Sequence, residues 1–458
     1  METQAKAPKQ EKNTAASNNA VTLEKLVSLC KRRGFVFQSA EIYSGLNGLY
    51  DFGPLGTLMK ENIYNAWKKS FNRLDKDIFF MDGSLLGPEI MWTASGHVEG
   101  FHDPLVDCKA CQARFRADDI DLEKPCPRCG KKEWSEVREF NLMFQTQVGA
   151  NTENSSRAYL RPETAQTMFV QFKNVMTSSR AKIPFGIAQI GKAFRNEITP
   201  KQFLFRVREF EQMEIEWFCK AETALEFFEF WRTERQNFYT AIGINPSKIH
   251  LRDHDKDELS HYSSATSDVE YEFPFGWKEL EGIAYRGNFD LTQHSTFSGK
   301  DLAVFDEETQ QSYTPHVVEC SVGVGRLFLT LLFDAYREEE TVTESGETDT
   351  RVVLALHPSI APVKVAFFPL VKALASEAEV LYKECKKRGI SAQFDVTGSI
   401  GKRYRRQDEI GTPYCITYDF ESAQDKTVTI RYRDSMQQER IAIDKIYDYL
   451  KQLTPFNE

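Results

Sequence analysis

The stretch FRNEITPKQFLFRVREFEQMEIEWF, residues 194–218, constrains the fold of this chain more than any other segment. It predicts two strands joined by the polar loop ITPKQ, with side chains that alternate between two faces. In the second strand, one face is apolar and carries Val207, Met213, Ile215 and Trp217. The other face carries Arg206, Arg208, Phe210, Gln212, Glu214 and Glu216. Such a charged face indicates either a solvent-exposed strand laced with salt bridges or a polar binding site.

The first strand places Arg195 and Glu197 on one face, beside Arg206 and Phe210 of the returning strand. The hairpin would then present two guanidinium groups, a carboxylate and an aromatic ring. Arginine forks bind phosphate oxygens in a bidentate manner, and a phenyl ring gives a purine a stacking surface. The set predicts a nucleoside triphosphate site, although the exposed strand face stays open as the alternative.

A second arginine lies in GVGR, Gly323 to Arg326, at the start of an apolar and hence buried helix predicted over 321–336. A glycine turn at a helix N-terminus binds anions through free amides and the helix dipole, and Arg326 would add a phosphate clamp. Glycines kept for tight packing are the alternative. Because neither GxxxxGK[ST] nor GxGxxG occurs, any ATP site here is built from a sheet and arginines.

The order of predicted elements indicates an α+β chain. Helices are expected at about 23–33, 55–72 and 221–241, and strand-like segments alternate with turns up to about residue 300. This pattern favours a largely antiparallel sheet. A cysteine-rich insert interrupts it at roughly 105–135.

The chain divides into a polar tail at 1–20 that we expect to be disordered, a main domain at 21–336, a linker at 337–350 and a second domain at 351–458. The linker is charged and nearly devoid of large apolar groups. After it, strand patterns alternate with a helical stretch near 361–388, as in a small α/β domain.

Composition and charge limit the partners and the compartment. No apolar run reaches the roughly 18 residues that a membrane span requires, and the N-terminus lacks a secretory signal, so a cytoplasmic location is expected. The net charge of −9 argues against a non-specific nucleic-acid coat but allows a local basic patch. KRYRRQ, residues 402–407, sets four cations around a tyrosine, which suits a single-stranded RNA loop or a solvated basic loop.

Four of the nine cysteines form two Cys-x-x-Cys pairs, Cys108/Cys111 and Cys126/Cys129, separated by fourteen residues. This spacing predicts a closed tetrahedral zinc site with a structural role. Free thiols or a redox pair are the alternatives. RDHDKDELSHY, residues 252–262, also holds histidines and carboxylates, but its spacing matches no standard metal cage, so a solvated turn is favoured.

Three segments resemble, in order, the signature motifs of class II aminoacyl-tRNA synthetases. GLYDFGPLG with its following helix is similar to the dimer-forming motif 1, FRNE with RVREF to motif 2, and ECSVGVGRLF to motif 3. Within the class, the chain resembles glycyl-tRNA synthetases of the homodimeric type. That likeness rests on LRPETAQ, FEQMEIEWF, LRDHDKDELSHYS and GSIGKRYRRQDEIGTPYCIT. It implies an antiparallel sheet flanked by helices, followed by an α/β anticodon-binding domain.

The resemblance implies the reaction as well. Glycine and ATP would form glycyl-adenylate, and the glycyl group would pass to the 3′ end of tRNA(Gly). Arg195 would hold the α-phosphate, Arg206 and Arg326 the outer phosphates, and Phe210 would stack on adenine. Mg²⁺ is expected between the phosphates, with Glu279 and Glu319 as candidate partners. Positioning and charge stabilisation would carry the rate.

The site residues implied by the likeness fall into two sets. The ATP set is Arg195, Asn196, Glu197, Phe205, Arg206, Phe210, Glu279, Leu280, Gly323 and Arg326, with Arg195, Glu197, Arg206 and Arg326 as catalytic residues. The glycine set is Arg116, Glu163, Phe210, Gln212, Glu214, Arg286, Glu319 and Ser321. A glycine pocket rejects every competitor by crowding, because all are larger. Glu163 as a first-turn charge, and Glu319 and Ser321 as ordinary turn residues, are the alternatives.

Two other functions compete with this interpretation. A non-catalytic relative would bind nucleic acid with the same fold, but it could lose the phosphate arginines, which are present here. A class II synthetase for serine, threonine or proline would share the motifs and differ in the amino-acid pocket.

Overall fold

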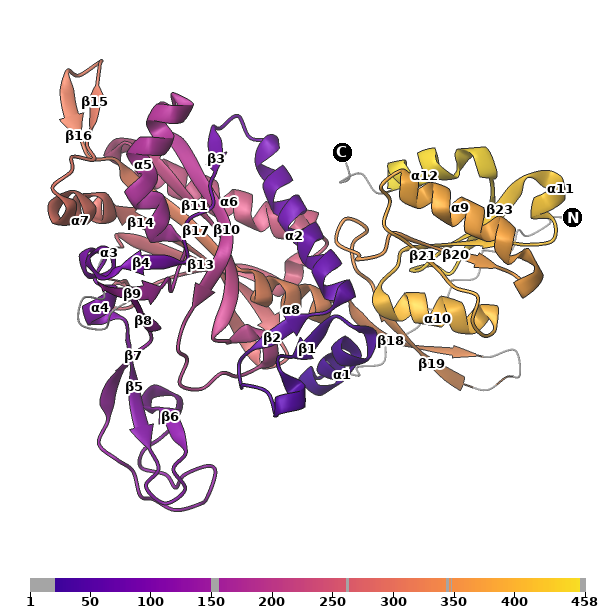
Figure 1. Cartoon of the computed structure of the whole chain (residues 1–458), viewed down its shortest axis with the longest axis horizontal. Helices are drawn as coiled ribbons and strands as arrows, with labels where there is room; N and C mark the ends of the chain where they lie inside the picture. The colour runs from indigo at the N-terminus through magenta and orange to yellow at the C-terminus, as the bar shows by residue number, and fades with distance from the viewer. Residues whose placement is uncertain (1–20, 150–155, 261–262, 343–345, 347, 454–458) are drawn as a thin grey trace, which may run out of the picture.

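The computed structural model describes residues 21–149, 156–260, 263–342, 346 and 348–453. It has two lobes, and the cysteine-rich insert projects from the larger one (Figure 1). The polar tail predicted for residues 1–20 lies outside the described part of the chain. None of the helices in the described residues is long and apolar enough to cross a membrane.

A seven-stranded sheet forms the centre of the larger lobe. Its strands in spatial order are β12 (Ile249–Asp253), β13 (Ala265–Phe273), β14 (Gly276–Gly287), β17 (His316–Gly323), β11 (Glu209–Cys219), β10 (Phe185–Phe194) and β3 (Ile78–Phe80). All neighbours are antiparallel except β10 and β3. The antiparallel sheet predicted from the turn-rich sequence is therefore confirmed.

Helices cover both faces of this sheet. On one face the core contains side chains of α2 (Pro54–Asn72), α6 (Ala224–Ala241) and α8 (Val324–Ala335). On the other face, α5 (Ala165–Ser179) and α7 (Phe289–Ser298) form a second core over part of the sheet. The uncovered remainder of that face is where a ligand can reach the strands.

Strand β11 alternates as its sequence predicts. Met213, Ile215 and Trp217 lie in the core beneath α6 and α8. Glu214 and Glu216 point to the opposite face and are 1% and 0% exposed. The alternative of a solvent-exposed, salt-bridged face is therefore wrong for these two glutamates.

The predicted hairpin is wrong in one respect, because the ladder stops before the arginines begin. Strand β10 ends at Phe194 and β11 begins at Glu209, so Arg195, Glu197 and Arg206 lie in the connection between the strands. The connection contains a 3₁₀ turn at Phe203–Phe205. Its backbone amides also find partners away from the sheet, since Asn196 donates to the Leu142 carbonyl at 2.8 Å.

Smaller elements surround the sheet. The helix α1 (Leu23–Arg33) precedes the hairpin β1 (Val36–Gln38) and β2 (Tyr50–Phe52). The sheet β4 (Leu86–Pro88), β9 (Ser156–Leu160) and β8 (Gln145–Val148) adjoins the short helices α3 (Glu89–Ala94) and α4 (His97–Gly100). The insert contains β6 (Arg114–Arg116), β5 (His102–Asp107) and β7 (Arg138–Asn141), and a hairpin after α7 contains β15 (Val304–Asp306) and β16 (Gln311–Tyr313).

The C-terminal lobe has its own sheet and its own core. Strand β20 (Val365–Pro369) lies parallel to β21 (Ala392–Phe394) and β22 (Tyr414–Tyr418), and β23 (Thr427–Tyr432) and β24 (Gln438–Ala442) continue antiparallel. Its helices are α9 (Ala375–Lys387), α10 (Ile400–Ile410), α11 (Ser422–Asp425) and α12 (Ile446–Leu453). The α+β class with a C-terminal α/β domain is thus confirmed.

The segment 337–350 is not an irregular linker. Its described residues belong mostly to β18 (Tyr336–Val342) and β19 (Thr348–Leu354), which pair as an antiparallel ribbon between the lobes. Thr350 and Thr341 stand in this ladder because threonine suits a strand as well as a loop. A polar composition alone therefore did not distinguish a strand from an irregular linker.

Candidate active site

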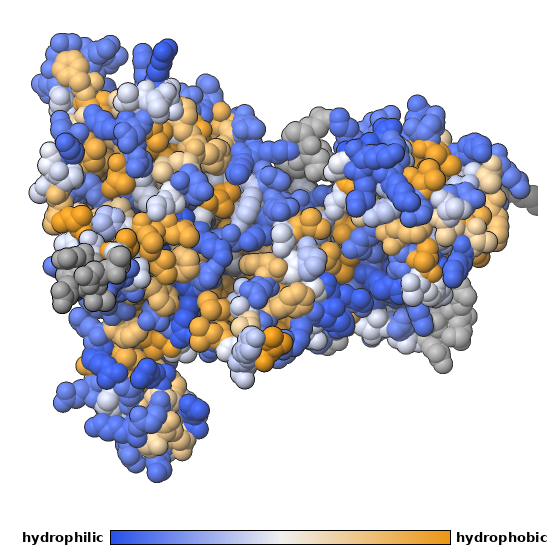
Figure 2. Space-filling model, in the orientation of Figure 1, coloured by the Kyte–Doolittle hydropathy of each residue, from blue (hydrophilic) through white to orange (hydrophobic). Residues whose placement is uncertain are grey.

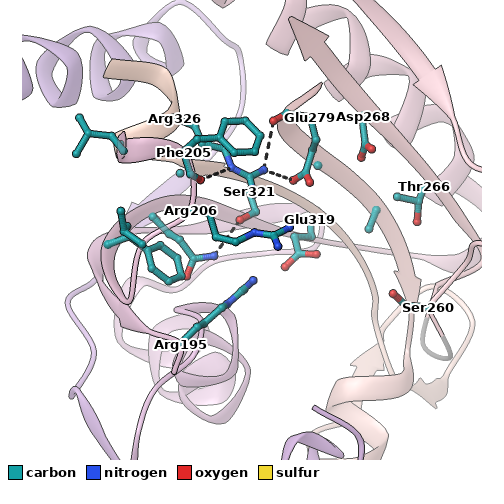
Figure 3. A pocket seen from close by; sticks show the side chains of 18 of the residues that line it. Arg195, Phe205, Arg206, Ser260, Thr266, Asp268, Glu279, Glu319, Ser321 and Arg326 are labelled. Carbon is teal, nitrogen blue, oxygen red and sulfur yellow. Dashed lines mark hydrogen bonds and ion pairs between the residues drawn. The ribbon is translucent and has the colours of Figure 1, made fainter. Parts of the chain in front are cut away.

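A cavity of about 370 Å³ lies on the open part of the sheet face (Figure 3). The residues predicted for ATP or glycine that line it are Arg195, Phe205, Arg206, Phe210, Gln212, Glu279, Glu319, Ser321, Gly323 and Arg326. Strands β11, β14 and β17, the connection before β11 and the start of α8 supply them. Segments more than a hundred residues apart in the sequence thus meet in one site.

The three predicted arginines converge on this cavity (Figure 3). Arg195 donates from Nε to the Pro162 carbonyl at 3.1 Å, and its guanidinium lies 5.3 Å from the Phe210 ring centre. Arg206 has a buried Nη1 without a hydrogen-bond partner among the described residues. A buried guanidinium nitrogen that lacks a partner is costly, so an anionic ligand there would stabilise the site.

Arg326 is held in place on three sides. It donates to the Phe205 carbonyl at 3.3 Å, forms an ion pair with Glu279 at 3.1 Å and lies 4.6 Å from the Phe205 ring centre. This pairing holds the pKa of Glu279 below its usual value. The guanidinium is therefore oriented before a phosphate binds.

The glycines of GVGR have two different roles. Gly323 lines the cavity, and a Cβ there would meet nothing nearer than Arg326 at 3.8 Å. A Cβ at Gly325 would come within 3.1 Å of the Leu204 carbonyl, where the connection crosses the start of α8. Tight packing, the alternative from the sequence, thus explains Gly325, while Gly323 keeps the helix start open.

Carboxyl groups gather beneath the cavity. Glu214 accepts hydrogen bonds from the Thr164 amide at 3.1 Å, from Gln212 at 2.6 Å and from Ser321 at 2.5 Å. Burial, followed by the neighbouring Glu319 and Glu163, raises the pKa of Glu214 to about 7. This carboxyl therefore changes its charge close to neutral pH.

Arg286 lies among these acids and is itself buried. It bonds Asp290 through two nitrogens at 2.8 Å and Glu319 at 3.1 Å. Glu163 pairs with His97 at 3.3 Å. Burial raises the pKa of the Glu163 carboxyl, but the interactions with His97 and Arg286 are stronger together and leave that pKa below its usual value. The carboxyls outnumber the cations, so the cluster favours a cationic ligand.

Several predicted residues do not line the cavity. Leu280 packs in the core behind β14, so only its backbone can face the site. Glu197 is buried beside the arginines; burial raises its pKa, and Arg206 and Arg195 oppose that shift. The Asn196 side chain lines a neighbouring hollow, and Arg116 pairs with Asp103 at 3.0 Å inside the insert.

The cavity lining also contains residues to which the sequence assigned no role in a site: Leu204, His254, Ser260, Thr266, Asp268, Gly282 and Ala284. His254 lies in the segment 252–262, for which the sequence predicted a turn; residues 261–262 of it are outside the described part. Ser260 lies in the same segment, whereas Thr266, Asp268, Gly282 and Ala284 belong to strands β13 and β14, which carry no motif. Only the order of strands in the sheet brings them to the arginines.

The four cysteines Cys108, Cys111, Cys126 and Cys129 come together in the insert, with all four sulfurs within 4.8 Å of one another. The Cys108–Cys129 and Cys111–Cys126 sulfurs are 3.6 and 3.8 Å apart. Zn–S bonds of about 2.3 Å in a tetrahedron give sulfur separations of about 3.8 Å. The cluster is therefore compatible with zinc, and it is the one metal-binding group found among the described residues.

KRYRRQ does not form a basic loop. It lies in α10, and three of its cations are engaged within the lobe: Arg403 with the Pro369 carbonyl, Arg405 with Asp349 and Arg406 with Asp395. The Tyr404 hydroxyl bonds Thr417 at 2.7 Å. The predicted loop is therefore wrong and the Tyr404 hydroxyl is engaged with β22, whereas RNA binding by the cations of this helix stays a prediction.

Comparison with known proteins identifies both lobes. Residues 144–336 match the tRNA synthetase class II core domain (G, H, P, S and T), and residues 364–453 match the anticodon binding domain. A protein of Caldanaerobacter subterraneus subsp. tengcongensis named glycine--tRNA ligase is 51% identical, over 95% of this chain and 99% of its own. Proteins of the same name from Treponema denticola and Acetivibrio thermocellus are each 50% identical, over 95% and 94% of this chain and 97% and 98% of their own.

Proposed function

The chain belongs to the glycine–tRNA ligases among the class II aminoacyl-tRNA synthetases, and from this premise we propose which part of each substrate its side chains bind. It activates glycine with ATP and transfers the glycyl group to tRNA(Gly). The non-catalytic alternative and the alternatives for serine, threonine or proline find no support among these relatives.

For ATP, we assign the α-phosphate to Arg195, the outer phosphates to Arg206 and Arg326, and the adenine ring to Phe210. The support is that all four side chains line one cavity, with Arg195 over the Phe210 ring. Guanidinium groups fixed in advance stabilise the charge that develops on pyrophosphate as it leaves. No side chain has to act as a nucleophile in this step.

Mg²⁺ fits the acidic side of the same cavity. The Glu279 side chain is about half exposed, so its carboxylate keeps access to a cation although it pairs with Arg326. Glu319 lies on the neighbouring strand β17 and also lines the cavity. We assign Mg²⁺ to these two carboxylates, where the ion would neutralise charge between the phosphates.

For glycine, we assign the ammonium group to the carboxyl cluster around Glu214 and Glu319. The supporting observation is the shortage of cations in that cluster, which an ammonium group would correct. Arg286 is already bonded to Asp290 and Glu319, so we assign it to holding Glu319 in place. Gln212 and Ser321 bond Glu214, and we assign to them the crowding that would reject a methyl group on the α-carbon.

We also propose a homodimer formed through the segment around β1 and β2. Exposed apolar side chains gather there, and Figure 2 shows orange side chains over this region. They are Phe37, Ile42, Tyr43, Leu46 and Leu58, and Ile42 and Tyr43 are more than 80% exposed. Such a patch is typical of a protein interface.

Zinc would be bound in the insert, outside the cavity in which glycine is activated. A four-thiolate site has no open position for water, so we assign it a structural role. Asp119 of the insert bonds Lys201 at 2.9 Å and lies 3.8 Å from Arg206. The insert would thereby support the connection that carries Arg206. We propose the cytoplasm as the location because the substrate is tRNA.

The observation that carries these assignments is the convergence of three arginines and a carboxyl cluster in one cavity. Glycine-dependent ATP–pyrophosphate exchange tests it. Arg195→Ala and Arg326→Ala are each expected to slow exchange by roughly 100-fold or more, as loss of a charge-stabilising donor does. Arg73→Ala is the matched control, because Arg73 pairs with Glu234 on the surface. Exchange at the wild-type rate in either cavity variant would refute the assignment.

A further inference from the structure

One wall of the cavity is not used by these assignments. His254, Thr266 and Asp268 form it, and Figure 3 shows Thr266 and Asp268 on the side away from the three arginines. In the sheet, Asp268 pairs with Gly282, which pairs with Ser321. Two strand spacings of about 4.8 Å therefore separate the backbone of Asp268 from that of Ser321, and the side chains of both strands reach into the space between.

The imidazole of His254 is fixed from two directions. Its Nε2 lies 2.8 Å from Asp268 Oδ2, and its backbone amide donates to the Thr266 carbonyl at 3.0 Å. A carboxylate at Nε2 selects the tautomer with hydrogen on that nitrogen. Nδ1 then becomes a hydrogen-bond acceptor, and no residue in the described part of the chain bonds it.

The charge of this wall indicates what it can bind. Asp268 is 7% exposed; burial and then Glu279 raise its pKa, which makes it a stronger acceptor toward His254. The nearest cation is Arg252, 3.9 Å from Asp268 and on the far side of β13 from Gly282. A wall of this kind repels phosphate and suits a neutral group with hydroxyls.

The floor in front of the wall is open. A Cβ built at Gly282 would meet only Asp268 Oδ1, at 3.9 Å. The proposed ATP site lies on the arginine side of the cavity, and the ribose of ATP stays there because it is bonded to adenine and to the α-phosphate. The remaining substrate with a neutral diol is the terminal ribose of tRNA.

We propose that His254, positioned by Asp268, receives the 3′-terminal ribose of tRNA and accepts the proton of its attacking hydroxyl at Nδ1. The hydroxyl oxygen forms the ester bond to the glycyl carbonyl carbon. The bond from that carbon to the phosphate oxygen breaks, and AMP leaves with the electron pair. The imidazolium is stabilised by the Asp268 carboxylate and returns its proton to water. The assignment rests on the proposed ATP and glycine sites.

Separate measurement of the two half-reactions tests it in the full-length enzyme. His254→Ala is expected to slow single-turnover transfer from enzyme-bound glycyl-adenylate to tRNA(Gly) by roughly 100-fold, the usual range for a lost general base. Pyrophosphate exchange, which needs no tRNA, should stay within about threefold of wild type. Asp268→Asn should slow transfer as well, because an amide NH2 that donates to Nε2 leaves the hydrogen on Nδ1 and removes the acceptor.

His250→Ala is the matched control, since His250 lies on the neighbouring strand β12, bonds Glu270 and does not line the cavity. Both half-reactions should be unchanged in it. An equal fall of exchange and transfer in the His254 variant would overturn the proposal, because the wall would then hold ATP or glycine. Unchanged transfer would overturn it as well. If His254→Ala does not fold, His254→Gln serves in its place. If Arg195→Ala loses exchange and the His254 variant does not, the ATP site and the role of His254 have been tested independently.

Discussion

Glu216 is a buried acid whose charge opposes the folded state. It is 0% exposed, and neither carboxyl oxygen has a hydrogen-bond partner in the described structure. It stands directly opposite Glu319 across the β11–β17 ladder. Burial, then Glu319, raises its pKa well above the usual value, and Arg286 only partly compensates. We therefore expect Glu216 to be protonated at neutral pH.

Linkage gives the size of the effect. The unfolded chain releases this proton near the ordinary glutamate pKa, so at higher pH the folded state holds one proton more than the unfolded state. Its free energy of unfolding then falls by about 1.4 kcal/mol per pH unit as the pH rises. Glu216→Gln removes this term and leaves a side chain of the same shape. The variant should gain stability relative to wild type as the pH rises from 5 to 7, up to a limit of about 3 kcal/mol for one proton over two pH units.

Urea denaturation of both proteins at pH 5, 6 and 7, followed by tryptophan fluorescence, measures this difference. Other titrating groups cancel because they are common to the two chains. Glu226→Gln, an exposed glutamate on α6, is the control and should show no pH-dependent difference. A stability difference between Glu216→Gln and wild type that is constant across pH would show that Glu216 is ionised in the folded state, and the reasoning would fail.

Four further outcomes follow from the site. The KM for glycine should fall as the pH rises through about 7, because deprotonated Glu214 attracts the ammonium group, and Glu214→Gln should flatten that profile. Gly282→Ala should leave the unfolding midpoint unchanged, since its Cβ meets only Asp268 at 3.9 Å, yet it should slow transfer to tRNA(Gly) because the methyl group enters the space proposed for the ribose. Cys126→Ser should remove about one zinc per chain by elemental analysis and lower the melting temperature. Ile42→Glu should give monomers in sedimentation, whereas Val380→Glu, at an apolar position on α9 that is also exposed, should not.

Local periodicity predicted the elements that depend on neighbours in the sequence. The helix bounds 23–33 were predicted to the residue, and the alternation of β11 placed Glu214 on the ligand side. Cysteine spacing predicted the cluster because four ligands close together in the sequence need few long-range contacts to meet.

The remainder depended on tertiary contacts. The helix predicted near 361–388 begins with a buried strand, β20, because a short apolar run fits either structure and only parallel pairing with β21 and β22 decides between them. His254 and Asp268 were missed for the same reason. The short turn after Phe273 favours the pairing of β13 with β14, but nothing in these segments indicates that β14 lies beside β17, and that long-range pairing is what brings them to the cavity.

The sheet separates charge in a way that orients glycine. Cations enter from the connection and from α8, whereas carboxyls stand on the strands, with Glu214 opposite Ser321 and Glu216 opposite Glu319. An amino acid between the two regions lowers its energy by placing its ammonium group over the strands and its carboxylate toward Arg195. In that orientation the carboxylate oxygen would face the α-phosphate that we assign to Arg195. The same field that binds glycine therefore aligns it for attack, and an analogue that lacks the ammonium group should lose alignment as well as affinity.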